Sequence, residues 1–432
     1  MQSRMIFTGV HLYDGHGGRA RHDVAVVVEN RMISAVIEQG DVGPGQQVRV
    51  NGMAMMPGMT VGHWHGEFAD IGPPLFSYGR AGTFIGTEKP PIVLALQAAN
   101  ALRYALHSGV LRVISASCSN DIDAQLKLAL ADGLIEGADI TPCSRHVLTT
   151  GDQEDRGHWW ANDYGDGLRR IGGNIFVDGP SAVQKAVRQE ILRGADIIKT
   201  YLDGGHGLEW TSAYRSLLPE EFAALVRAAH ERGKRVRVHV TNKESILRCV
   251  ALGVDILDHC DYIDEECIEA MAKAGTWFVP SPLFGKLASS AARGLPLNPE
   301  DPTDRSWLNL VAMLRKADDA GVRIVPGDDY GAQGMAHGLG AYARELVLYV
   351  EEFGISPERV IGWATGNGAD MALVGQVTGT IEPGKAADLI LVAGDPALDM
   401  TLLQNPTSNI PLILRAGKPV KNHIGADFAA AG

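Results

Sequence analysis

One pattern repeats along the second half of the chain: an amphipathic segment of helical period, a glycine, and a short β-branched run that ends in a polar residue. The stretch PEEFAALVRAAHERGKRVRVHV has Pro219 suited to a first helical turn, Gly233 suited to a helix end, and RVRVHV as a strand. Gly253, Gly275 and Gly321 close the helical segments of the next three units. Strands that alternate with helices in this way predict a parallel sheet covered by helices.

Less regular units precede these four, and together they give eight strands. In chain order the strand sequences are TVGHWH, LRVISA, DITPCS, ADIIKTY, VRVHV, VDILDH, TWFVP and VRIVP. Eight parallel strands alternating with helices are the number that closes a β/α barrel. We therefore predict an α/β protein with a (β/α)8 TIM barrel over residues 58–377.

The two ends of the chain lack a helical period. Residues 1–57 contain alternating runs such as DVAVVVENRMISAVIE, and residues 378–432 contain GTIEPGKAADLILVAGDP and IPLILRAGKPVK. Both are typical of strands and turns. They predict one small β domain built from the two termini.

Composition limits the class of function. The 432 residues include 39 Lys plus Arg and 51 Asp plus Glu, a formal charge of −12, so we expect neither nucleic acid nor an anionic membrane as a partner. Five scattered cysteines without C-x-x-C spacing argue against a disulfide framework. The sequence has no apolar run typical of a signal peptide or a membrane span, so a cytoplasmic location is the expectation.

Residues with metal-binding chemistry recur at the ends of the predicted strands. His63 and His65 end the first strand, and alternate residues of a strand share one face, so their imidazoles converge. His239 ends the fifth strand, His259 ends the sixth, and Asp329 follows the eighth. A barrel brings these strand ends to one rim. Imidazole and carboxylate together suit zinc and similar divalent ions.

Lys199, in the fourth strand, is the exception among these residues. An ammonium group cannot bind a cation and is costly to bury without a partner. Two interpretations remain open: carbon dioxide carboxylates the amine to a carbamate that bridges two metals, or the ammonium pairs with an acidic neighbour such as Asp196 or Asp203. Four histidines and an aspartate facing this strand favour the carbamate.

The combination of GMTVGHWH, ADIIKTY, VRVHV, ILDHC and VPGDD with the tail GTIEPGKAADLILV resembles the amidohydrolase superfamily, in its imidazolonepropionase-like and prolidase-like branch. The resemblance covers nearly the whole chain. It implies a distorted barrel flanked by a small β-sandwich domain, with two divalent metal ions at the barrel rim. Zinc is the expected metal, with manganese or iron as alternatives. It assigns His63, His65 and Asp329 to one metal, His239 and His259 to the other, and N6-carboxylated Lys199 to the bridge, with Asp328 as the weaker candidate beside Asp329.

Such a centre implies hydrolysis of an amide-type C–N bond in a small molecule by a metal-bridging hydroxide, with Asp329 as general acid/base. The alternatives are an Xaa-Pro-type dipeptidase or carboxypeptidase, and a mononuclear deaminase of the same superfamily, which typically lacks the lysine found here at position 199. A non-catalytic scaffold is disfavoured because all six ligand positions are filled. Tryptophans in the loop after the third strand favour a non-peptide amide. Relatives commonly self-associate, so a homo-oligomer is expected.

Further residues are candidates for contact with the substrate. His146, just after the third strand, is placed to polarise a substrate oxygen as a catalytic residue, and a hydrogen-bonded loop histidine is the alternative. The remaining candidates are aromatic or lie close to the ligands, with packing or turn formation as the alternative for each. They are Trp64, His158, Trp159, Tyr201 and His206.

Overall fold

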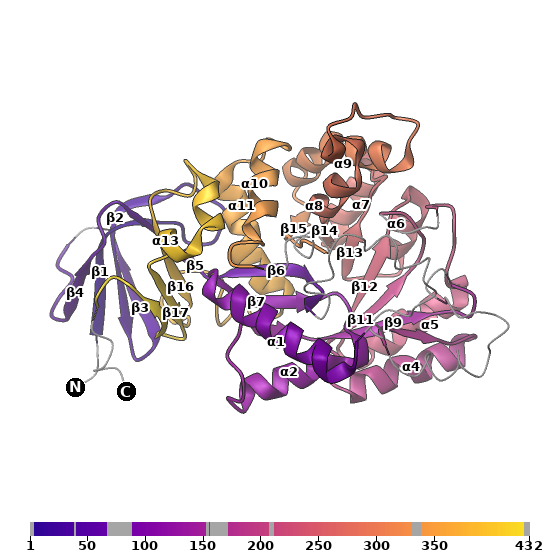
Figure 1. The fold of residues 1–432 in the computed structure, drawn as a ribbon, viewed down its shortest axis with the longest axis horizontal. Helices are drawn as coiled ribbons and strands as arrows, with labels where there is room; N and C mark the ends of the chain where they lie inside the picture. The colour runs from indigo at the N-terminus through magenta and orange to yellow at the C-terminus, as the bar shows by residue number, and fades with distance from the viewer. Residues whose placement is uncertain are drawn as a thin grey trace. The chain divides into compact units, whose positions relative to one another are not determined.

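The computed structural model describes residues 4–38, 40–66, 89–152, 155, 172–206, 211–329 and 338–426. The chain forms two compact units, drawn in Figure 1. We call them the terminal unit (Met1–Val61, Arg103–Val113 and Gly338–Gly432) and the barrel unit (Gly62–Leu102 and Ile114–His337).

The terminal unit is built on one mixed sheet to which both ends of the chain contribute. Its strands are β1 (Arg4–Leu12), β2 (Arg21–Glu29), β3 (Met32–Ile37), β4 (Gln46–Arg49), β5 (Met53–Pro57), β16 (Leu389–Ala393), β17 (Leu412–Arg415) and β18 (Lys418–Asn422). They lie in the order β18-β17-β16-β5-β1-β2-β3, and β4 pairs with β1. The antiparallel pair β5–β16 joins the N-terminal strands to the C-terminal ones. Buried side chains from both ends, such as Phe7, Val26, Leu389 and Leu412, share its core.

The terminal unit also contains four α-helices of the described C-terminal segment. They are α10 (Ala343–Glu351), α11 (Pro357–Gly362), α12 (Gly368–Met371) and α13 (Pro406–Asn409). These helices contribute none of the candidate site residues.

The barrel unit contains the eight strands expected from the sequence. Two of them, β6 (Met59–Trp64) and β7 (Val110–Ser115), begin in the terminal unit and end in the barrel unit. The others are β8 (Asp139–Thr141) with β9 (Cys143–Leu148), β11 (Ile197–Tyr201), β12 (Arg235–Val240), β13 (Ile256–His259), β14 (Trp277–Val279) and β15 (Arg323–Ile324); a short β10 (Asn174–Phe176) pairs with β9. The sheet order is β10-β9-β11-β12-β13-β14-β15, with parallel pairing throughout.

The barrel is distorted at its third strand. Pro142 divides this strand into β8, which joins a three-stranded sheet in the order β6-β7-β8, and β9, which pairs with β11. Proline has no N–H to donate to a ladder, so the two sheets separate at this residue. At the other edge, the Gly62 N–H donates to the Pro326 carbonyl at 2.6 Å and brings β6 beside the end of β15.

Helices follow the strands as the repeated pattern predicts. They are α1 (Pro91–His107), α2 (Ile122–Ala131), α4 (Pro180–Leu192), α5 (Pro219–His230), α6 (Lys243–Ala251), α7 (Glu265–Ala274), α8 (Pro282–Ala288) and α9 (Pro302–Asp319). The cap of α7 shows the local chemistry: Asp264 accepts a hydrogen bond from the Cys267 N–H, and Gly275 ends the helix with a left-handed φ of 69°. In Figure 1 these helices surround the strands of the barrel unit.

The architecture confirms the predicted fold class, a distorted (β/α)8 barrel with a β-sandwich domain formed from both termini. The five cysteines are free thiols, and all are buried. Within the described parts of the chain, no helix is both long and apolar enough to cross a membrane.

Candidate metal centre

His63, His65 and Asp329 bring three ligand atoms together inside the barrel unit. The Nε2 atoms of His63 and His65 lie 3.1 Å apart. Asp329 Oδ1 lies 3.2 Å from the first of these atoms and 3.3 Å from the second. All three residues are buried. Ligand atoms bound to a tetrahedral zinc ion at about 2.0 Å are about 3.3 Å apart, so this triangle has the dimensions of one metal site.

A glycine permits this close approach. A Cβ atom at Gly327 would lie 2.5 Å from the backbone nitrogen of His63, which real Cβ atoms do not tolerate. Gly327 stands two residues before Asp329, so its missing side chain lets the segment after β15 lie against the end of β6. The glycine in the sequence VPGDD therefore has a structural reason.

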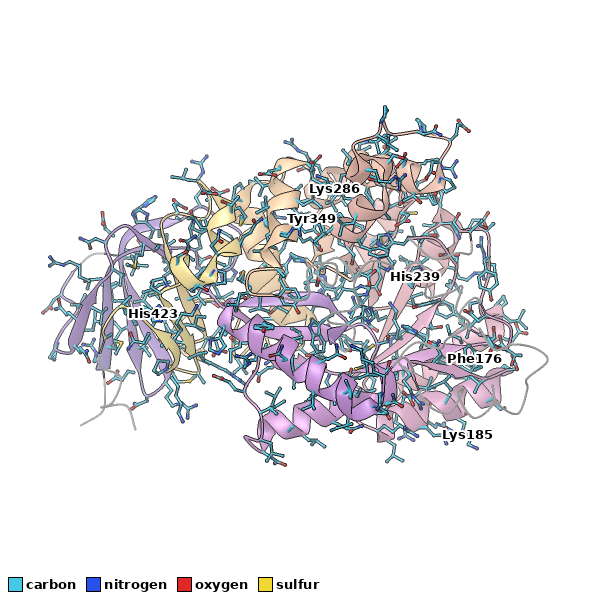
Figure 2. All side chains as sticks on the ribbon, in the orientation of Figure 1. Phe176, Lys185, His239, Lys286, Tyr349 and His423 are labelled. Carbon is cyan, nitrogen blue, oxygen red and sulfur yellow. The ribbon has the colours of Figure 1, made fainter. Side chains whose placement is uncertain are left out.

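His259 and His239 complete a cluster of imidazoles at the same rim. His259 ends β13, and its ring centroid lies 4.6 Å from that of His239 in β12 and 5.3 Å from that of His63. His63, His259 and Asp329 each offer one ligand atom, and these three atoms lie within 4.8 Å of one another. Figure 2 draws the side chains and labels His239 on the strands of the barrel unit.

Two nitrogens in this cluster are buried and lack a partner. His239 Nε2 and His259 Nδ1 have no hydrogen-bond partner among the residues that the structure describes. A buried polar atom without a partner carries a free-energy cost, which coordination to a cation would remove. The donor set therefore fits a metal ion on two observations, the triangle of ligand atoms and these unpartnered nitrogens.

The protonation states also suit a metal. Burial lowers the pKa of His63 and of His259, and it lowers the pKa of His239 to about 3. Burial acts in the opposite direction on Asp329, but its contacts with His63 and His65 hold the pKa of that carboxyl well below its usual range. Neutral imidazoles and an ionised carboxylate are the forms that coordinate divalent cations.

Two of the ligand candidates have unusual backbone conformations. His259 has a φ of 71° and Asp329 has a φ of 50°, both in the left-handed region that non-glycine residues rarely occupy. Such residues concentrate at functional sites, where the surrounding structure holds the strain. At His259 the left-handed turn interrupts strand alternation, so that Asp258 and His259 both contact the same cluster.

Lys199 is fully inside the barrel and pairs with Asp258. Its side chain is 2% exposed, and its Nζ contacts Asp258 Oδ2. The two acidic partners considered from the sequence are wrong. Asp196, just before β11, pairs with two other lysines, and Asp203, just after β11, accepts a hydrogen bond from the Thr241 N–H at 2.8 Å. Burial lowers the pKa of Lys199 despite the carboxylate beside it.

Arg237 is a site residue that the sequence analysis missed. It lies in β12, is 0% exposed, and its Nε lies 2.9 Å from each oxygen of Asp258. The signal was present in VRVHV, because Arg237 stands two residues before His239 and therefore on the same face of the strand. Asp258 was missed for a different reason, since regular alternation would have turned it away from His259.

His146 lies within β9, so its placement after the third strand was wrong. Its Nδ1 lies 2.8 Å from Asn174 Oδ1 and its Nε2 lies 3.2 Å from the Tyr201 hydroxyl. The ring of Tyr201 in turn lies 4.7 Å from that of His239. Burial lowers the pKa of His146 well below its usual value. Both ring nitrogens are thus engaged in a buried, neutral network beside the imidazole cluster.

The other predicted substrate residues have different positions. His206 stacks on His259 with a centroid distance of 3.8 Å, and its Nδ1 lies 2.7 Å from Asp261 Oδ1. Trp64 is 0% exposed and lies between His63 and His65 in sequence, on the opposite face of the strand, so the structure favours its packing alternative. His158 and Trp159 lie outside the described residues.

Comparison with known proteins places this chain in a family. The model of the amidohydrolase family matches residues 55–420. The ochratoxinase of Aspergillus niger is 30% identical over 256 residues, which are 57% of this chain and 50% of that protein. The imidazolonepropionase of Cutibacterium acnes is 29% identical over 203 residues, 46% of this chain and 45% of that protein. The chain thus spans about half the length of the curated relatives that it matches.

Solved structures share the fold. The crystal structure of the A. niger ochratoxinase has a TM-score of 0.81 at 23% identity, covering 98% of this chain and 96% of that one. A Xaa-Pro dipeptidase with bound methionine in its active site has a TM-score of 0.78 at 24% identity, covering 97% and 100%. Fold and site together define an α/β barrel protein with a histidine and carboxylate cluster at its rim. The chain belongs to the amidohydrolase family.

Metal binding by this cluster is testable without a substrate. Zinc at a free concentration about 100 times its Kd should stabilise the metal-free protein by about 2.7 kcal/mol per site, measured by thermal or urea unfolding. His63→Ala should lose most of this stabilisation. His230→Ala is the control, because His230 lies on α5 and pairs with Asp255 at 2.9 Å. Equal stabilisation of His63→Ala and the control would contradict the site.

Proposed function

We propose that this chain is a binuclear metal-dependent hydrolase that cleaves an amide-type C–N bond in a small molecule. The observation that carries the proposal is the convergence of the His63, His65 and Asp329 ligand atoms beside two buried imidazoles with unpartnered nitrogens. Membership of the amidohydrolase family and the 30% identity to an ochratoxinase support this class of reaction.

Two divalent ions, with zinc as the expected metal, would be held by these residues. His63, His65 and Asp329 form one donor set, and His239 and His259 form the second. When bound, the metals would supply Lewis acidity that lowers the pKa of water and polarises a carbonyl group. Manganese and iron are alternatives that the same nitrogen and oxygen donors accept.

Lys199 is proposed to bridge the two donor sets as a carbamate. Lys199 and Arg237 are both buried, and the same carboxylate, Asp258, pairs with both. Carboxylation would convert Lys199 from a cation to an anion. Asp258 would then form its ion pair with Arg237 and no longer with Lys199. Burial favours the neutral amine, which is the form that reacts with carbon dioxide, because it lowers the pKa of Lys199. The mononuclear deaminase alternative offers no reason for a buried lysine at this position.

Asp329 is proposed as the general acid/base. Its carboxylate is ionised and buried at the triangle of ligand atoms, so it can take a proton from the attacking water and deliver it to the departing nitrogen. His146 has a different role from the one the sequence suggested. Because its Nδ1 faces Asn174 Oδ1 and its Nε2 faces the Tyr201 hydroxyl, His146 orients Tyr201, and Tyr201 is the group that we place against the substrate.

The reaction is tested by an activity screen of metal-loaded protein on anilides, N-acyl amino acids, Xaa-Pro dipeptides and lactones. We expect turnover of an amide, with a non-peptide amide preferred over the dipeptide. Asp329→Asn should lower kcat by about 10²- to 10⁴-fold, because it removes the proton carrier. Asp328→Asn is the matched change one residue earlier and should retain most activity. Loss of activity in Asp328→Asn alone would transfer the acid/base role to that residue.

The carbamate is tested by ¹³C NMR after exposure to labelled bicarbonate. Wild-type protein should show a carbamate resonance and bind about two metals per chain, and Lys199→Arg should lose both the resonance and metal. A wild-type protein that binds two metals without a carbamate resonance would support the alternative in which the Lys199 ammonium stays paired with Asp258.

A further inference from the structure

We propose that Arg237 is a positioning residue that sets the geometry of the candidate metal centre. It holds Gly62, the residue before His63, and Asp258, the residue before His259, at the same time. The inference rests on the metal site described under Proposed function and does not depend on which bond the enzyme cleaves.

The guanidinium of Arg237 is surrounded by hydrogen-bond acceptors. Its Nη2 donates to Asp258 Oδ1 at 2.6 Å, and its Nε lies 2.9 Å from both oxygens of the same carboxylate. Its Nη1 donates to the Gly62 carbonyl at 2.7 Å and lies 3.3 Å from the Ser115 carbonyl. Arginine presents five donors in one rigid plane, so a single side chain fixes acceptors on several strands at once.

These contacts connect the two sheets of the distorted barrel. Arg237 and Asp258 lie on β12 and β13 of the larger sheet, whereas Gly62 and Ser115 lie on β6 and β7 of the smaller one. The Gly62 N–H is also fixed, because it donates to the Pro326 carbonyl. The N–H and the carbonyl group of Gly62 are therefore both fixed by hydrogen bonds. These two bonds fix the backbone position of the next residue, His63.

Asp258 carries the effect of Arg237 to the imidazole of His63. Asp258 Oδ1, the oxygen bound by Arg237, lies 3.4 Å from His63 Nδ1. A carboxylate at one ring nitrogen fixes the ring and leaves the other nitrogen for a metal. His63 Nε2 is the atom that lies in the triangle with His65 and Asp329. The order of contacts is thus Arg237, Asp258, His63, and then the metal site.

A second buried arginine provides a matched comparison. Arg145 on β9 is 7% exposed and donates from Nη2 to Glu190 Oε1 at 2.8 Å. After loss of its main arginine, each carboxylate keeps a cationic neighbour: Lys199 beside Asp258, and Arg193 at 4.0 Å from Glu190. Arg145 forms ion pairs with Glu190 and Asp121, which are not metal-ligand candidates. Arg145 therefore controls for the loss of a buried charge pair alone.

The experiment compares Arg237→Met, Arg237→Lys and Arg145→Met with the wild type. Metal-free protein, shown to be folded by circular dichroism, is titrated with zinc in competition with a chromophoric chelator, and its cobalt complex is recorded by visible absorption. We expect zinc affinity to fall about 10- to 100-fold in Arg237→Met, the loss typical when the support of a ligand is removed, with a changed cobalt spectrum. Arg237→Lys keeps a basic side chain but neither the planar fork nor the permanent charge, so its affinity should fall as well. Arg145→Met should keep wild-type affinity and the wild-type spectrum.

The outcomes separate this inference from the proposed function. If Arg237→Met does not fold, Arg237→Lys decides the question by the same two measurements. Folded Arg237 variants with wild-type zinc affinity and an unchanged cobalt spectrum would overturn the positioning role while leaving the metal centre in place. An equal loss of zinc affinity in Arg145→Met would show that the loss in Arg237→Met comes from general destabilisation, and it would overturn the inference too. Wild-type protein that binds no zinc would remove both the metal centre and the role of Arg237.

Discussion

The carboxylate of Asp258 pairs with two buried cations, and the rest of the site depends on how this local charge is balanced. Lys199 and Arg237 are buried and share this one carboxylate. Moving a charge out of water is costly unless it is paired, so the arrangement favours a change that removes the positive charge of Lys199. Deprotonation and carboxylation of Lys199 is such a change. Divalent ions in the adjacent histidine cluster would then stabilise the new anion.

The metal-ligand candidates could be predicted from the sequence because they depend on rules that hold for every parallel barrel. Strand alternation puts His63 and His65 on one face, and equivalent strand ends meet at one rim, which brings in His239, His259 and Asp329. This prediction does not require the detailed contacts between neighbouring strands. The structure places these residues together, with three ligand atoms at mutual distances of 3.1 to 3.3 Å.

What could not be predicted depends on contacts between particular strands. The partner of Lys199 was sought among nearby residues in sequence, whereas Asp258 lies 59 residues further along the chain. The register pairs Asp258 with His239 and so turns it toward the cluster, and His259 reaches the same cluster through a left-handed conformation, which alternation does not anticipate. His146 likewise belongs to a strand and not to a loop, because β9 continues through this residue and pairs there with β10 and β11. The residue types were visible in the sequence, whereas the strand register and the unusual backbone conformations that bring these residues together could not be predicted from it.

The choice of arginine at position 237 follows from the same balance of charge. A lysine at this position would lose its proton easily in a buried site close to divalent cations, and Asp258 would then lose its partner. Arginine stays protonated under all conditions that a protein tolerates, and its fork reaches the carboxylate and two backbone carbonyls together. Lys199 needs the opposite property, since only an amine that gives up its proton can react with carbon dioxide. The two buried cations therefore have complementary roles, one permanently charged and supporting, the other convertible and reactive.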